Sequence, residues 1–290
     1  MRTFKDSNPI AVTLYFLFVT GITMFLFDPI LNGISFLGAL IFSLVCGDGR
    51  DNKKHLLCLV LFVATALINP LVSHNGVTVL FFINDNPITL ESLLYGCSNA
   101  FMLVSVLYWF SCFSYLMDSD KLLYVFGSFS PKAALVFSMA LRYIPLFGDR
   151  SKKIRATQKT MGLYKDGNIL DMIRGRVREF SIMTTWALEK GIITADSMSA
   201  RGYGQGRRTR FTNFRFYLCD VILLILSSVL AVFVIMSAVK HDFVFYPEIV
   251  VPKMSLISVI GYVSYGVLVL IPTINEWKEE IRWRYLRSKI

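Results

Sequence analysis

The stretch PKAALVFSMALRYIPLF, Pro131–Phe147, decides how the rest of this 290-residue chain is read. It is nearly all apolar, but Arg142 and Pro145 interrupt it, and it falls short of the about 20 apolar residues that a spanning helix needs. If it crossed a membrane, the basic segment that follows would face outward, whereas Lys and Arg concentrate on cytoplasmic sides. The stretch is therefore expected to form a cytoplasmic helix that packs against a membrane domain.

The composition of the chain indicates that membrane domain. Hydrophobic residues make up 54% of the sequence. Charged residues make up 17%, below the roughly 25% of soluble domains. The composition therefore predicts an all-α, polytopic membrane helix bundle of about six spans. The first span is expected to remain uncleaved, because Asp28-Pro29 comes after it instead of the small-residue cleavage site of a signal peptide. The expected spans are Ile10–Phe27, Ile30–Cys46, Leu56–Val72, Ser92–Met117, Phe214–Val239 and Met254–Ile274.

The distribution of Lys and Arg orients these spans. The loop Ser73–Glu91 contains neither residue and is expected outside, while the basic N-terminus and the tail Asn275–Ile290 are expected in the cytoplasm. The chain is thus predicted to be a multi-pass plasma-membrane protein with both termini cytoplasmic. Its expected domains are a four-span membrane domain (1–117), a cytoplasmic domain of long helices (118–213), a two-span hairpin (214–274) and a basic tail (275–290).

The cytoplasmic domain holds most of the formal net charge of +10. From Asp149 to Asn213 there are 14 Lys or Arg against 6 Asp or Glu, a net +8. Two long helices are expected there, because helix-capping residues and glycine stops bracket two apolar-periodic segments. The first is capped by Ser130 and stops at Gly162; the second is capped by Asn168 and stops at Gly202. The second helix is apolar on two faces, which predicts burial on both: Phe180, Met183 and Ala187 on one, Ile182, Trp186 and Ile193 on the other.

The ends of these helices are QKTMG (Gln158–Gly162) and SARGYG (Ser199–Gly204). Ala200 and Gly202 flank Arg201 with almost no side chain, so a partner can approach the backbone closely. An arginine in that setting suits planar, bidentate recognition of a carboxylate or phosphate. The residues alone leave a second reading open, a solvated arginine that gains a few tenths of a kcal/mol from the helix dipole.

NPLVSHNGVTVLFFINDNPITLESLLYG (Asn69–Gly96), with SMALRYIPLF and SMSARGYG, resembles the transmembrane T component of energy-coupling factor transporters. This resemblance implies a non-catalytic membrane scaffold of a vitamin or metal-ion importer. Its partners would be a substrate-binding membrane subunit (S component) and two cytoplasmic ABC-type ATPases, which would bind ATP and Mg. In that family two coupling helices each end in Ala-Arg-Ser or Ala-Arg-Gly, and each arginine docks in an acidic groove of one ATPase.

By this resemblance Ala200, Arg201 and Gly202 form the second coupling motif, and Thr160, Met161 and Gly162 stand where the first belongs. Met161 replaces the arginine of the family. Lys159 or Arg155 could supply a charge nearby, or Met161 could fill an apolar pocket. The two ATPase contacts are therefore expected to be unequal in strength.

The remaining motifs argue against other chemistry. The sequence has no GxxxxGK[ST] motif, and GYGQG (Gly202–Gly206) follows no strand, so no nucleotide, cofactor or metal is expected on this chain. No catalytic residues are proposed. Asp220 is expected at the surface or paired with an arginine. The basic cluster before the fifth span is expected on anionic lipid headgroups, not on nucleic acid; it includes Arg207, Arg208 and Arg210.

Two alternatives remain at this stage. A conventional ABC permease lining its own pore would have a similar number of spans, but it would carry a short coupling segment. A membrane enzyme acting on lipid-linked substrates would need ionisable residues gathered at one interface, whereas the carboxylates here are scattered.

Overall fold

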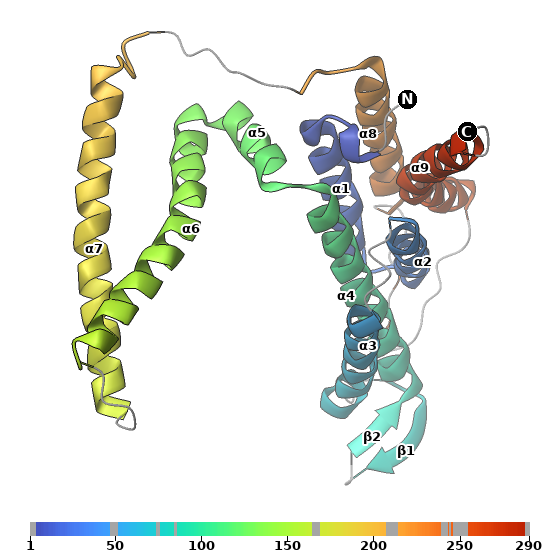
Figure 1. Cartoon of the computed structure of the whole chain (residues 1–290). Helices are drawn as coiled ribbons and strands as arrows, with labels where there is room; N and C mark the ends of the chain where they lie inside the picture. The colour runs from blue at the N-terminus through green and yellow to red at the C-terminus, as the bar shows by residue number, and fades with distance from the viewer. Residues whose placement is uncertain are drawn as a thin grey trace. The chain divides into compact units, whose positions relative to one another are not determined.

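The computed structural model describes residues 4–46, 52–73, 76–83, 86–163, 169–206, 214–238, 243, 245 and 255–287. The chain divides into two compact units, Met1–Val125 with Phe214–Ile290, and Phe126–Asn213. Both are built from helices (Figure 1), which confirms the predicted all-α bundle.

In the first unit, each expected span is a helix. Four are long and apolar enough to cross a membrane, and they are α3 (Asn52–Val72), α4 (Leu90–Leu116), α8 (Leu218–Ala238) and the Leu256–Lys278 part of α9 (Leu256–Arg287). The other two, α1 (Pro9–Phe25) and α2 (Pro29–Val45), are apolar helices of 17 residues each. They are separate because Asp28 caps α2 through its side chain, 3.1 Å from Ile30 N, and Pro29 opens the new helix.

The ends of the membrane unit differ from the expectation in two places. α9 continues past Pro272 to Arg287, so most of the segment expected as a tail is helical. Between α3 and α4 the chain forms an antiparallel hairpin where only a loop was expected. Its strands, β1 (Val79–Ile83) and β2 (Asn86–Thr89), pair Ile83 with Asn86. The apolar and β-branched residues of β1 favour a strand in this short segment.

The centre of the membrane unit joins four helices through buried polar side chains. The indole Nε1 of Trp109 (α4) donates to Ser35 Oγ (α2) at 3.1 Å. Thr23 Oγ1 (α1) lies 3.1 Å from Ser35 Oγ and 2.9 Å from Tyr265 Oη (α9). All four side chains are almost completely buried, so each polar group meets a partner inside the bundle, as an apolar interior requires.

The second unit contains the two predicted long helices, α6 (Pro131–Thr160) and α7 (Ile169–Ala200). Ser130 caps α6 as expected, with its Oγ 3.4 Å from Ala133 N. A short helix that was not predicted, α5 (Ser119–Phe129), precedes α6 and straddles the division between the units. α6 bends along its length in Figure 1, and Pro145, inside it, lacks the backbone donor that a straight helix needs there. The expected cap of α7, Asn168, lies outside the described residues.

Candidate functional site: the ends of the α6–α7 helix pair

The C-terminus of α6 closes with a Schellman motif. Gly162 takes a left-handed φ of +67°, which only glycine adopts without strain. Its N–H donates to Lys159 O at 3.1 Å, and Leu163 N–H donates to Gln158 O at 3.1 Å. These two bonds satisfy carbonyls that would otherwise lack partners at a helix end. The residue at the cap position is Met161, whose side chain is 68% exposed.

The C-terminus of α7 closes with the same motif. Gly202 has a φ of +75°. Its N–H donates to Ser199 O at 3.0 Å, while Tyr203 N–H donates to Met198 O at 3.1 Å. Arg201 therefore occupies the cap position that Met161 occupies in α6. The sequence prediction that both helices stop at these glycines is confirmed, and the two residues are structurally equivalent.

Arg201 is exposed, as is its neighbour Ala200. Among the described residues, no carboxylate forms an ion pair with Arg201. At the other end Thr160 Oγ1 donates to Thr157 O at 2.8 Å, and Lys159 is exposed. A guanidinium on a rigid cap, with small neighbours, is available to an external acceptor.

α6 and α7 run antiparallel (Figure 1), so the two caps lie at opposite ends of the pair. Tyr143 Oη lies 2.9 Å from Thr194 Oγ1, and Phe147 packs edge-to-face on Trp186 at 5.7 Å between ring centroids. Further along, Arg155 pairs with Glu179 at 3.3 Å. Helices of this length extend about 45 Å at about 1.5 Å per residue, so Met161 and Arg201 lie at two well-separated ends.

Glu179 is the buried polar anchor of this helix pair. It is 6% exposed and accepts hydrogen bonds from Ser151 Oγ and from Arg155 Nη2. Arg155 is thereby engaged with α7, whereas Lys159, which is nearer to Met161 in the sequence, is exposed. The sequence analysis did not single out Glu179, because the two α6 side chains that bond it, Ser151 and Arg155, lie 28 and 24 residues away along the chain.

Replacing Glu179 with Ala is expected to loosen the pair. The change leaves Ser151 and Arg155 without their acceptor; because the Arg155 side chain is 45% exposed, the loss is discounted to about 1 kcal/mol. Amide hydrogen exchange across the facing segments of α6 and α7 should rise about fivefold. Glu189→Ala, which removes an exposed carboxylate of the same helix, should leave exchange unchanged. Equal exchange in both variants would contradict the anchoring role.

The apolar faces of α7 are only partly covered. Within the Phe126–Asn213 unit, α6 covers one side of α7 only, so α6 alone does not provide the burial predicted for both faces. Trp186 packs on α6, but Phe180 is 74% exposed, and Ile182 and Ile193 are also exposed. α6 therefore leaves part of the apolar surface of α7 uncovered.

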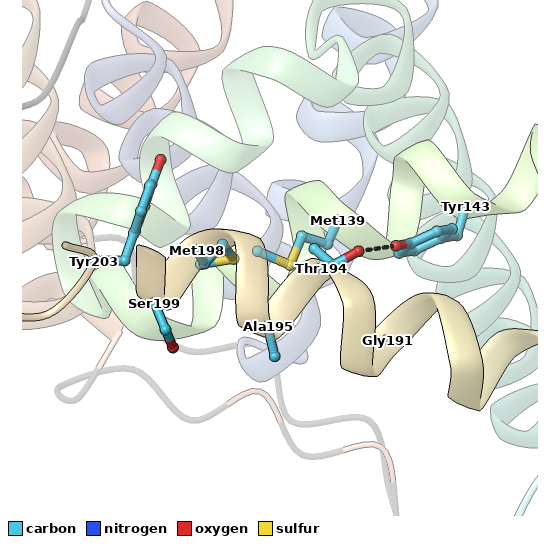
Figure 2. A pocket seen from close by; sticks show the side chains of 8 residues that line it. All are labelled: Met139, Tyr143, Gly191, Thr194, Ala195, Met198, Ser199 and Tyr203. Atoms are coloured by element: carbon cyan, nitrogen blue, oxygen red, sulfur yellow. Dashed lines mark hydrogen bonds between the residues drawn. The ribbon is translucent and has the colours of Figure 1, made fainter. Parts of the chain in front are cut away.

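A pocket of about 370 Å³ lies between α6 and the C-terminal turns of α7 (Figure 2). Its walls include two methionines from facing helices, a hydrogen-bonded Tyr–Thr pair, and the tyrosine of the α7 cap. The lining residues are Met139, Tyr143, Gly191, Thr194, Ala195, Met198, Ser199 and Tyr203. The pocket was not foreseen, although Gly191, Thr194 and Met198 recur on one helical face.

The other sequence candidates fall elsewhere. Asp220 is buried and accepts from the backbone N–H groups of Asn8 and Tyr217, both at 3.1 Å, so it is neither at the surface nor shown with an arginine partner. Its position at the first turn of α8 makes backbone donors available.

The remaining candidates are not part of the helix-pair ends. Arg142 is exposed. Among the described residues no cluster could hold a metal ion. The lipid-headgroup residues Arg207, Arg208 and Arg210 lie outside the described part of the chain.

Comparison with known proteins identifies relatives of this chain. The profile of the CbiQ family, described as Cobalt transport protein, matches residues 7–212. The "Energy-coupling factor transporter transmembrane protein EcfT" of Listeria innocua is 35% identical over 100 residues, 34% of this chain and 38% of the relative. "EcfT 1" of Listeria monocytogenes is 33% identical over 91 residues, 31% of this chain and 34% of that protein. A Streptococcus equi protein with the EcfT name is 27% identical over 101 residues, 34% of this chain and 38% of the relative.

These alignments span little more than a third of each relative's length. The family profile, in contrast, takes in most of the chain, including α6, α7 and both glycine caps. This chain therefore belongs to the CbiQ family, and the resemblance of its motifs to the transmembrane T component of energy-coupling factor transporters is confirmed.

Proposed function

We propose that this T component is the energy-coupling scaffold of an ABC-type importer for a vitamin or a metal ion. Its partners are two ABC-type ATPases, which bind ATP and Mg, and a substrate-binding membrane subunit, the S component. The chain itself binds no nucleotide and is not catalytic. The observation that carries the proposal is the pair of equivalent Schellman caps at opposite ends of an antiparallel helix pair, one of them presenting Arg201.

In this proposal residues 118–213 form the coupling domain, between membrane domains 1–117 and 214–274 and ahead of the basic tail 275–290. One ATPase binds the Ala200-Arg201-Gly202 cap, and the other binds the Thr160-Met161-Gly162 cap. When ATP binding closes the ATPases, the two caps are displaced. Continuous helices transmit displacement along their axes, and the helix pair passes the motion to the membrane domains and the S component.

The distribution of basic residues supports a cytoplasmic position for the coupling domain and both termini in the plasma membrane. The cluster of Arg207, Arg208 and Arg210, just ahead of α8, would bind anionic lipid headgroups at about 1 kcal/mol per residue. This placement brings the α6–α7 caps to the side of the membrane where ATP is available.

Co-purification tests the proposal. The tagged chain, extracted from native membranes in mild detergent, should bring down two ABC-type ATPases and a third, substrate-binding membrane protein, identified by mass spectrometry. A conventional permease would retain ATPases without that third protein. Recovery of ATPases alone, or of none, would contradict the scaffold role.

The Met161 cap is expected to contribute less than the Arg201 cap. Met161→Ala removes an exposed apolar side chain, so binding of the ATPase pair should weaken only about threefold to tenfold, the scale of burying part of one methionine. Pull-down of the purified ATPases at fixed salt measures this. A loss as large as that of an Arg201 variant would show that the two ends contribute equally.

A further inference from the structure

The pocket beside the α7 cap has walls suited to an apolar guest. The hydroxyls of Tyr143 and Thr194 lie 2.9 Å apart and hydrogen-bond each other, so they place little demand on a ligand. Met139 and Met198 bring thioethers from facing helices toward the same space (Figure 2). Methionine side chains adapt their shape to apolar groups without requiring polar partners. Ser199 and Tyr203 add two further hydroxyls, but most of the lining is apolar, so a hydrocarbon side chain fits it better than a polar metabolite.

The pocket adjoins the helix cap that carries Arg201. Tyr203 and Met198, which the cap joins by a backbone hydrogen bond of 3.1 Å, both line the pocket and bracket Arg201 in the sequence. The volume of about 370 Å³ is many times the roughly 30 Å³ share of one water molecule, enough for a large side chain. A protein that reaches Arg201 with a carboxylate is therefore expected to lie next to the pocket as well.

We infer that the pocket receives one apolar side chain, a leucine, methionine or phenylalanine, from the same ATPase whose carboxylate binds Arg201. This inference rests on the proposed function, since it adds a second anchor to that interface. In this proposal the α7 end offers the partner two features, the Arg201 guanidinium and the neighbouring pocket. The α6 end instead offers the exposed side chain of Met161. The inference requires the ATPase at the α7 end to carry an apolar side chain close to the acidic residue that binds Arg201.

A larger side chain introduced on α7 that fills the pocket tests the inference while Arg201 is left unchanged. A Cβ at Gly191 would meet no described atom within 4 Å, and Gly191 lies inside α7, so Gly191→Leu adds bulk to the pocket without backbone strain. Binding of the purified ATPase pair should weaken about tenfold or more, because the apolar side chain of the partner loses its site. Gly148→Leu is the matched control: Gly148 is a helix-interior glycine with equally open surroundings on α6, and this variant should bind like the parent.

A second variant separates occupancy from folding. Gly191→Cys should bind the ATPases nearly as the parent does, and alkylation of the folded protein with N-ethylmaleimide should then weaken binding to the level of Gly191→Leu. The parent chain and Gly148→Cys, alkylated in the same way, account for modification of the native cysteines, of which Cys219 is exposed. Equal binding by parent, Gly191→Leu and alkylated Gly191→Cys would overturn the pocket inference.

The two proposals fail in different ways. If Arg201→Glu abolishes binding while a filled pocket does not, the scaffold role stands and the apolar anchor is wrong. If the ATPases do not bind the parent chain at all, the scaffold role is wrong, and the inference about the apolar side chain in the pocket is wrong as well.

Discussion

Arg201→Glu is expected to abolish stable binding of the ATPase at the α7 end and, with it, transport. Arg201 is exposed at a rigid cap, and among the described residues no ion pair uses its charge. In the proposed complex it becomes desolvated against a carboxylate. Truncating one member of such a pair costs about 2–5 kcal/mol, which is roughly a 30-fold to several-thousand-fold loss of affinity. Reversing the charge adds repulsion to that loss.

The measurement is a pull-down of the purified ATPases at fixed salt, followed by substrate uptake in cells. Arg201→Lys keeps the charge but loses the planar fork, so it should retain partial binding. Lys153→Glu reverses an exposed charge in the C-terminal half of α6 and should not weaken binding at the α7 end, because Lys153 is far from the α7 cap. If Arg201→Glu retained the ATPases as well as Lys153→Glu does, the coupling role of the α7 cap would be excluded.

Gly38→Ala is expected to destabilise the membrane unit by about 2–3 kcal/mol, near the upper end of overpacking effects. Gly38 lies on α2 against α9, and a Cβ there would overlap Cγ1 of Val269. Val269 is 1% exposed, so it has little room to rotate away. The two helices approach this closely because the glycine has no side chain, and any added atom must push α2 and α9 apart.

The rescue variant makes this prediction specific. Removing the Val269 methyl groups should let the new Cβ fit, so Gly38→Ala combined with Val269→Ala should be more stable than Gly38→Ala alone. Such non-additivity is the signature of residues in direct contact. Gly33→Ala on the same helix meets no described atom within 4 Å and should not lower the thermal unfolding temperature in detergent, since Ala is the better helix former. Equal stability of the Gly33 and Gly38 variants would refute the close packing.

Local patterns in the sequence were sufficient for much of this molecule. Six apolar segments predicted the helices of the membrane unit, and the Asp28-Pro29 break separated α1 from α2. Glycine stops at Gly162 and Gly202 located both helix ends. These features depend on residues within a few positions of one another, because capping, proline geometry and left-handed glycine are local properties of the backbone.

By itself, then, the sequence determined the helical class, the approximate spans and the equivalence of the two helix ends. Only the tertiary structure decided that Glu179 meets Arg155, that Asp220 is buried against the backbone of Asn8, and that a pocket opens beside Arg201. It also showed which face of α7 its partner helix leaves exposed. The physical reason is that hydrophobic periodicity marks a surface for burial but does not name what covers it, since that depends on the packing of segments far apart in the chain.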